Sequence, residues 1–198
     1  MPRVFHFDTE ANRAIAEKKV FGQQITNDQY ADLAGDIWGD AEIEVSFNTR
    51  WPTRERDYPI KIRSQNGIYA TTIRLDNQDF NYCECIVFPP HRHQGHARAV
   101  LKRVAQTARA LGFSRLVASG SKSKKTNGNV VYPKLGFNAS IPKEVVPLLP
   151  PELASCTTIL DILDKEIGVA FWEAKGVQLN HMEFDLAPES RCCIRLGI

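Results

Sequence analysis

The feature that most constrains the fold is a change of hydrophobic period close to residue 90. Before that point, residues 60–88 alternate apolar and polar side chains, as strands with one buried face do. After it, apolar residues between 97 and 111 recur every three or four positions, while arginine and lysine side chains occupy the opposite face. The change therefore predicts an antiparallel meander that leads directly into an amphipathic helix.

The meander divides into three strands at two polar turns. Asn66 and Gly67 separate a strand that begins at residue 60 from a second strand over 68–75. A type I′ turn needs positive φ at both central residues, and this pair favours it. A second turn at 76–79 leads into a third strand over 80–88, which two prolines end because proline cannot donate to a sheet ladder.

The first forty residues predict two helices. Asp8 or Thr9 caps the first helix and Gly22 ends it, while Thr26 caps a second helix that ends near Gly39. The stretch that follows, 48–58, is rich in turn-forming residues and arginine.

Beyond the amphipathic helix, which ends at Gly112, helices and short strands alternate. The pattern predicts a strand at 113–118, a polar loop at 119–127, a helix at 128–135 and a strand that starts at Gly136. The stretch 141–151 contains four prolines and is a connector. Residues 152–175 predict one or two helices, and the alternation over 181–186 predicts a final strand.

Composition and length favour one ordinary globular domain. The 198 residues include 43% hydrophobic and 24% charged side chains and carry a net charge of +2. This balance gives no reason to expect nucleic acid or an anionic membrane as a partner. No apolar run is long enough for a membrane span, and no secretory signal is evident at the N-terminus. The five cysteines, an odd number at C-x-C and C-C spacings, predict a reducing, cytoplasmic setting.

Residues 85–98 combine the features of an anion-binding site. They run from the third strand through a turn into the amphipathic helix, and Gly95 and Ala97 are small enough to let the backbone approach a bulky ligand. The first N–H groups of a helix have no partner inside it. Together with the helix dipole, they make a pyrophosphate site that consists mainly of backbone.

Two motifs in register resemble the GNAT acyltransferase superfamily. Counted from Val87, Arg92 follows after five residues, Gly95 after eight and Ala97 after ten, which resembles the R/Q-x-x-G-x-G/A signature. The segment 130–137, V-V-Y-P-K-L-G-F, resembles the Y-x-x-L-G-F segment of that family. The order of strands and helices between the two motifs also matches.

The resemblance implies a mixed α/β fold, with a splayed mixed sheet flanked by helices and an extra C-terminal helical segment. It implies a single domain over 1–198, with the motif-bearing core at about 58–140, the connector at 141–151 and a helix-and-strand part at 152–198. Coenzyme A would lie in the splay between the fourth and fifth strands of the family, and acetyl-CoA would be the co-substrate.

The resemblance also assigns site residues. Backbone groups of Ile86, Val87 and Phe88 would face the pantetheine arm, and Tyr132 would act as general acid for the departing thiolate. Tyr132 could also be a core tyrosine. The turn around the pyrophosphate would consist of Arg92, His93, Gln94, Gly95, His96 and Ala97.

Two positions depart from the family pattern. His93 stands where glycine is usual, and Lys125 stands where the family often has an asparagine. Lys122, Lys124 and Lys125 lie in the polar loop. They would favour a 3′-phosphate at the adenosine end of the coenzyme, or form only a solvated loop.

The base that deprotonates the amine is left open. Glu84 is the only carboxylate in the third strand, where the family often places one. Alternation puts Glu84 and Val87 on opposite faces unless a bulge intervenes. A solvated role for Glu84, with Asp79 or a water as the base, is the alternative.

Other reactive side chains favour structural interpretations. His91, His93 and His96 suggest a zinc site, but ligation would use the turn that the phosphate needs and no further ligand is near, so we expect no metal. Cys83 and Cys85 are predicted to be buried strand residues. The stretch 150–176 predicts either a packing helix or a dimer contact.

The leading hypothesis is an acyl-CoA-dependent N-acyltransferase that moves acetyl to a primary amine by direct attack. We expect the acceptor to be a small-molecule amine or a protein amino group, with no membrane partner, no nucleic acid and a homodimer as one option. A coenzyme A-binding module without catalysis is the alternative from another class. A transferase that acts on a macromolecule, protein or tRNA, is the third hypothesis.

Overall fold

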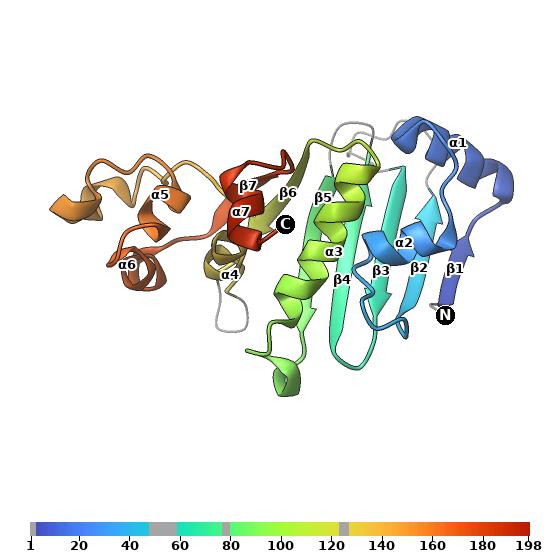
Figure 1. Cartoon of the computed structure of the whole chain (residues 1–198), viewed down its shortest axis with the longest axis horizontal. Helices are drawn as coiled ribbons and strands as arrows, with labels where there is room; N and C mark the ends of the chain where they lie inside the picture. The colour runs from blue at the N-terminus through green and yellow to red at the C-terminus, as the bar shows by residue number, and fades with distance from the viewer. Residues whose placement is uncertain (1–2, 48–58, 77–79, 123–126) are drawn as a thin grey trace. The chain divides into compact units, whose positions relative to one another are not determined.

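The structure is a computed structural model that describes residues 3–47, 59–76, 80–122 and 127–198 (Figure 1). The chain forms two compact units, Met1–Leu116 and Val117–Ile198. Strands that pair in both directions are flanked by helices, so the predicted mixed α/β fold is confirmed.

In its described part, the first unit contains a five-stranded sheet whose strands lie in chain order. The strands are β1 Arg3–Phe7, β2 Glu42–Phe47, β3 Ile60–Gln65, β4 Tyr69–Leu75 and β5 Phe80–Val87. β1 pairs in parallel with β2, and every later neighbour pairs antiparallel. The meander predicted from the alternating sequence corresponds to β3, β4 and β5.

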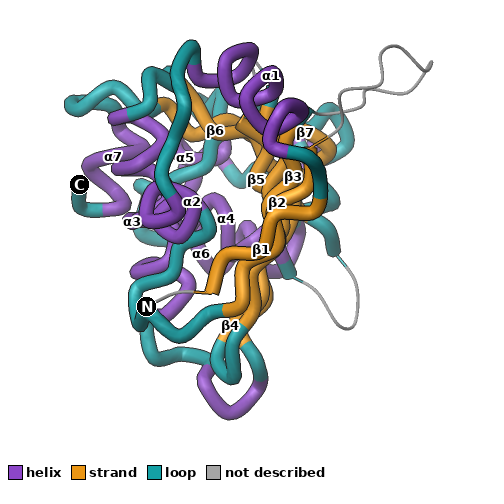
Figure 2. The backbone as a smooth tube through the Cα atoms, turned by 90° about the vertical axis from the view of Figure 1, so that its right-hand side faces the viewer, coloured by secondary structure: helices purple, strands orange, loops and turns teal. Residues whose placement is uncertain are grey.

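Three helices cover one face of this sheet (Figure 2). They are α1 Glu10–Phe21, α2 Asn27–Leu33 and α3 His96–Ala110. Thr9 caps α1 and Gly22 ends it, as predicted, and Thr26 forms a capping box with Gln29 at the start of α2. The strands alternate buried and exposed residues, so the helices cover an apolar face and the opposite face is polar.

The prediction for the first forty residues missed β1 and extended the second helix too far. β1 carries apolar side chains on both faces, including exposed Phe5 and Phe7, so it lacks a clean alternation. α2 ends at Leu33 because Gly35 adopts a positive φ of 76°. A β-carbon on Gly35 would lie 2.5 Å from a methyl group of Val100 on α3, so this close approach also requires glycine.

The hairpin between β3 and β4 forms at the predicted place, but the predicted type I′ turn is wrong. Neither Asn66 nor Gly67 has a positive φ. Instead, the Asn66 side-chain oxygen accepts hydrogen bonds from the backbone N–H groups of Ile68, at 2.8 Å, and Tyr69, at 3.0 Å. The asparagine therefore stabilises the turn through its side chain, as in an Asx turn.

A β-bulge interrupts β5 at Cys83. Tyr82 pairs with Ile73 and Glu84 pairs with Thr72, so Cys83 has no partner residue on β4. The bulge exposes Cys83, and the prediction that it is a buried strand residue is wrong. Cys85 is half-buried as a residue, although its thiol is shielded from solvent.

The second unit is built of short elements. They are most of β6 (Arg115–Gly120), α4 Gly128–Leu135, α5 Ile159–Leu163, α6 Gly168–Lys175, β7 Leu179–Asp185 and α7 Arg191–Leu196, with 3₁₀ turns at Val146–Leu148 and Pro151–Leu153. The bounds of α4 match the prediction. β6 starts two residues after the predicted start at residue 113, and α7 was not predicted. The predicted strand at Gly136 is replaced by two isolated bridges, Asn138 to Glu183 and Ser140 to Thr158.

The core of the second unit brings α4, α6, α7 and β7 together. Trp172 of α6 is fully buried, and its indole N–H donates to the carbonyl of Asn129 in α4 at 2.8 Å. A β-carbon on Gly136 would lie 2.7 Å from the Cys192 carbonyl oxygen, so α4 ends directly against α7. In the described residues, no helix has the length and apolar character that a membrane crossing requires.

Candidate functional site

The turn between β5 and α3 lies where the sequence motif predicted it. β5 ends at Val87, the 3₁₀ turn Pro89–His91 follows, and α3 begins at His96. The Phe88 N–H donates to the Ile68 carbonyl at 2.9 Å, which fixes the start of the turn to the neighbouring strand. The two prolines fit the 3₁₀ turn because they occupy its first positions, where no N–H donor is needed.

Two residues of the turn have left-handed backbone conformations. Gly95, the N-cap of α3, has φ 81°, and a β-carbon placed there would meet no atom within 4 Å. His93 has φ 63° and is the one non-glycine residue with a positive φ in the described chain. This position is the one at which the family pattern normally has glycine, so the structure accounts for that preference.

The backbone of the turn presents a run of free donors. In the described chain, no oxygen accepts from the N–H groups of His93, Gln94, Gly95, His96 or Ala97. The first helical bond of α3 goes from Ala99 to Gly95 at 3.1 Å. Successive free N–H groups at a left-handed turn and a helix start form a concave site for an anion.

The side chains of the turn bond to its own backbone and to each other. The Arg92 Nε donates to the Val87 carbonyl at 3.1 Å, and the Gln94 amide donates to the Pro90 carbonyl at 3.2 Å. The His96 ring lies 3.2 Å from the Gln94 side-chain oxygen and edge-to-face with Trp38 at 5.2 Å between centroids. These contacts hold the turn in shape without occupying its backbone N–H groups.

The backbone groups of the three residues predicted to face pantetheine point to different sides of β5. Ile86 pairs with Ala70 of β4, and Phe88 donates to Ile68, so the backbone groups of both point towards β4. Val87 lies between them, so its backbone N–H and C=O point to the other side of β5. Its carbonyl accepts from Arg92, which leaves the Val87 N–H as the donor on that side.

Glu84 is exposed on the polar face of β5, opposite Thr72. The bulge at Cys83 precedes Glu84, so regular alternation still places Glu84 and Val87 on opposite faces. The carboxylate has no hydrogen bond or ion pair to another described residue. Asp79, the alternative base, lies outside the described residues.

Tyr132 lies in α4 of the second unit and is only 7% exposed. Its ring packs against Phe137 at 5.3 Å between centroids, and the β-carbon position of Gly128 lies 3.4 Å from the ring. The Asn129 side chain, one turn earlier, is buried, and neither of its amide atoms has a partner among the described residues.

The lysines of the polar loop fall into two groups. Lys124 and Lys125 lie outside the described residues. Lys122 donates through its ammonium group to the Gly176 carbonyl, which ties the loop to the residue that ends α6.

The cysteines of β5 are thiols. Burial raises the pKa of the Cys85 thiol to about 11, because desolvation disfavours the thiolate. Cys83 is exposed as a residue, but desolvation of its thiol by the surrounding chain still raises the pKa of Cys83, although Arg74 and Lys61 oppose the shift. Neither thiol is therefore a ready nucleophile near neutral pH. The described residues contain no group of three or more metal-ligating side chains, His91, His93 and His96 included.

A strand, a turn of free N–H groups and a helix start form an arrangement that can accept an anion such as phosphate in an α/β protein. The model of the GNAT family of acetyltransferases matches residues 27–137, more than half of the chain, so this protein belongs to that family. No curated protein matches the chain in a sequence search.

Family members generally use acetyl-CoA, and the residues of the turn fit that group. Its pyrophosphate needs hydrogen-bond donors and space, and the turn has five unpartnered N–H groups around an open Gly95. Sequence reasoning found this turn because all of its parts are local. It placed Asn129 out of register with the family's asparagine, and it did not foresee the hydrogen bond from Trp172 to Asn129, because these residues lie 43 positions apart.

Proposed function

We propose that the protein is an acyl-CoA-dependent N-acyltransferase that transfers acetyl from acetyl-CoA to a primary amine. The observation that carries the proposal is the run of free backbone N–H groups from His93 to Ala97 around Gly95. The raised pKa values of the Cys83 and Cys85 thiols support direct attack by the amine over an acyl intermediate bound to a cysteine of β5. The five free cysteines support a reducing, cytoplasmic setting.

In this proposal the chain binds and orients the donor through backbone groups. The turn from Arg92 to Ala97 holds the pyrophosphate, and the Val87 N–H donates to the pantetheine arm. The bound coenzyme supplies a thioester whose carbonyl carbon accepts the amine nitrogen as the carbon–sulfur bond breaks.

Two side chains move protons. Glu84 takes a proton from the amine, since its carboxylate is exposed and unpaired among the described residues. Tyr132 gives its hydroxyl proton to the departing thiolate, a role that the match of its segment to the family model supports.

The first experiment tests the turn with Gly95→Glu. In the wild type, acetyl-CoA should raise the melting temperature because it binds only the native state. A glutamate at residue 95 would place a negative charge in the anion site and should abolish that rise. Gly22→Glu is the matched control, because Gly22 also has a left-handed φ, 72°, and open space around its β-carbon position.

Both variants should lose about 1–2 kcal/mol of stability from backbone strain. Only Gly95→Glu should lose the thermal shift. A full shift in Gly95→Glu, or none in the wild type, would refute the turn as the cofactor site.

The second experiment separates a transferase from a binding module. We expect acetyl-CoA to release free thiol when a panel of amines and peptides is supplied. Tyr132→Phe should lower kcat more than it weakens acetyl-CoA binding, because the hydroxyl acts as the thiolate departs. Tyr69→Phe, another buried tyrosine, whose hydroxyl lies 3.1 Å from Ser64, is the control. Tight binding without turnover would favour the module.

A further inference from the structure

The second unit contains a groove of about 830 Å³ that the proposed acetyl transfer does not use. β7 forms one side of it, and the segment 138–144 and the first residues of α5 and α7 form the others. Its polar lining includes Asn138, Glu144, His181, Glu183, Asp185 and Arg191.

One edge of β7 is open inside this groove. Asn138 and Glu183 exchange two backbone hydrogen bonds of 2.8 Å, so Glu183 directs its backbone groups to this edge. Strand geometry directs the N–H and C=O of His181 to the same edge. Ser140, which would be the next partner, instead bridges to Thr158, and no backbone bond joins Ser140 to His181 in the described chain.

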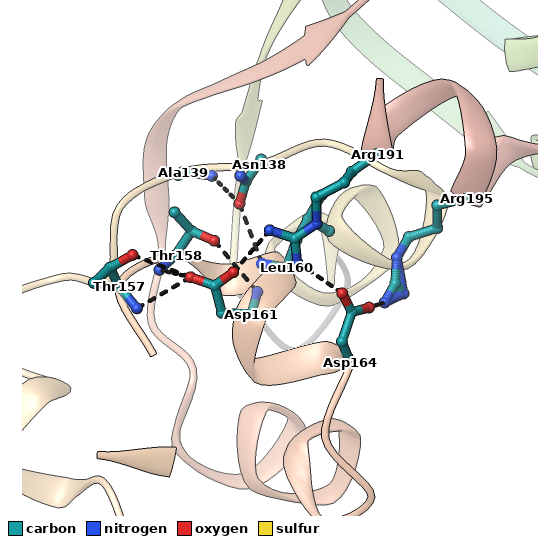
Figure 3. Close-up of polar contacts among 9 residues, drawn as sticks. All are labelled: Asn138, Ala139, Thr157, Thr158, Leu160, Asp161, Asp164, Arg191 and Arg195. Carbon is teal, nitrogen blue, oxygen red and sulfur yellow. Dashed lines mark hydrogen bonds and ion pairs between the residues drawn. The ribbon is translucent and has the colours of Figure 1, made fainter. Parts of the chain in front are cut away.

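Hydrogen bonds hold the segment 139–141 away from β7. The Ile159 N–H donates to the Ala139 carbonyl at 2.9 Å, and the Ile141 N–H donates to the Thr157 carbonyl at 3.1 Å. The Asn138 side chain accepts from the backbone N–H of Ala139 and of Leu160 (Figure 3). The segment therefore cannot close over the β7 edge without breaking these bonds.

The groove is acidic. Its lining has three carboxylates, those of Glu144, Glu183 and Asp185, and one guanidinium, that of Arg191. The Glu183 carboxylate lies 2.9 Å from a ring nitrogen of His181, so Glu144 and Asp185 carry most of the acidic character of the groove. Arg191 is already bonded to Asp161 and Asp164, both at 2.7 Å, so it does not neutralise the groove (Figure 3). The Glu144 carboxylate has no partner among the described residues.

We propose that this groove binds an extended, basic peptide segment, which adds as a strand to the open edge of β7. The unpaired backbone groups at His181 supply main-chain hydrogen bonds, as in other cases of strand addition. The carboxylates select lysine or arginine side chains by charge complementarity. The inference goes beyond acetyl transfer and does not depend on it.

The test uses the full chain without acetyl-CoA and three labelled eight-residue peptides in fluorescence anisotropy. The first alternates lysine with valine, the second has glutamate in place of lysine, and the third is the lysine peptide with alternate backbone nitrogens methylated. We expect the lysine peptide to bind, the glutamate peptide not to bind, and the methylated peptide to bind at least about tenfold more weakly.

Two variants test the lining. Glu144→Gln and Asp185→Asn should each weaken binding about two- to fivefold, the range of a single exposed charge pair. Asp185→Asn retains the side-chain oxygen that accepts from the Ala187 N–H. Glu152→Gln is the control, since Glu152 is exposed and does not line the groove.

Three results would overturn the proposal. They are no binding of the lysine peptide, equal binding of the lysine and glutamate peptides, or equal binding of the methylated and unmethylated peptides. Loss of acetyl-CoA binding or turnover would bear on the proposed function alone, because the peptide assay contains no coenzyme.

Discussion

Replacement of Asp161 by alanine should destabilise the second unit, because it removes one carboxylate that accepts hydrogen bonds from both the start of α5 and α7. One oxygen of Asp161 accepts from the Thr158 N–H at 2.8 Å and from the N–H and hydroxyl of Thr157, both at 3.1 Å. The other oxygen accepts from Arg191 at 2.7 Å, so Asp161 links α5 to α7 (Figure 3).

The magnitude follows from these two roles. Asp161 and Thr158 form the capping box of α5, and loss of such a cap costs about 1 kcal/mol. The ion pair with Arg191 is half-exposed on the arginine side, so it adds about 0.2–1 kcal/mol. Desolvation of the loop N–H groups left without an acceptor adds about 1 kcal/mol. We expect a total loss of about 2–3 kcal/mol.

Urea unfolding followed by circular dichroism, with hydrogen exchange of the α5 amides, measures this loss. Asp28→Ala is the matched control, because Asp28 also lies in the first turn of a helix and its side chain bonds to no described residue. Its loss should cost less than about 0.5 kcal/mol. Equal losses in both variants would refute the bridging role of Asp161.

The same contacts predict that the stability of the protein falls at acidic pH. Hydrogen bonds from Arg191 and the Thr157 and Thr158 backbone, outweighing desolvation, hold the pKa of Asp161 far below its usual value. A carboxyl with a lowered folded pKa stabilises the native state above its unfolded pKa of about 3.9 and loses this contribution as the pH falls further. Wild type should therefore lose more stability than Asp161→Ala between about pH 4 and pH 2. Parallel pH profiles would contradict this assignment.

Three further predictions concern the site and its support. His93→Gly should leave the urea midpoint equal or higher, because it relieves a left-handed conformation, whereas His93→Val should lower stability by about 1 kcal/mol. Trp172→Phe should lower the free energy of unfolding by about 1–3 kcal/mol, because the buried carbonyl of Asn129 loses its hydrogen-bond donor. Phe171→Leu, a substitution at the neighbouring half-buried position, is the control. Glu84→Gln should flatten the acidic side of the pH profile of kcat/KM and slow turnover about 10²–10⁴-fold, whereas the control Glu44→Gln should behave as wild type. If the pH profiles of Glu84→Gln and wild type overlap, Glu84 is not the base.

The sequence could predict the elements whose signals are local. The helical period of α3, the caps Thr9 and Thr26 and the stop at Gly22 are contained in a few neighbouring residues. The five-residue β1 was missed because its apolar side chains lie on both faces. α7 is only six residues long, too short for a helical period to stand out.

The candidate site likewise has local parts that the sequence predicts and parts that only the folded chain brings together. The turn between β5 and α3 is continuous in sequence, so the spacing of Arg92, Gly95 and Ala97 was enough to locate it. Its role in binding pyrophosphate stays a prediction. The bulge at Cys83 could not be predicted, because it depends on the register that β4 imposes on β5. The groove along β7 combines segments from 138 to 192, and only the folded chain brings these together.

The left-handed conformation of His93 is held by contacts within the chain. A non-glycine residue in the left-handed region costs about 1–2 kcal/mol, and it persists where surrounding contacts determine the backbone. Those contacts are present: Arg92 bonds back to Val87, Gln94 bonds back to Pro90, and His96 packs on Trp38. These contacts offset the strain at His93 and fix the directions of the free N–H groups, so under the proposed function the turn would need little ordering to bind an anion.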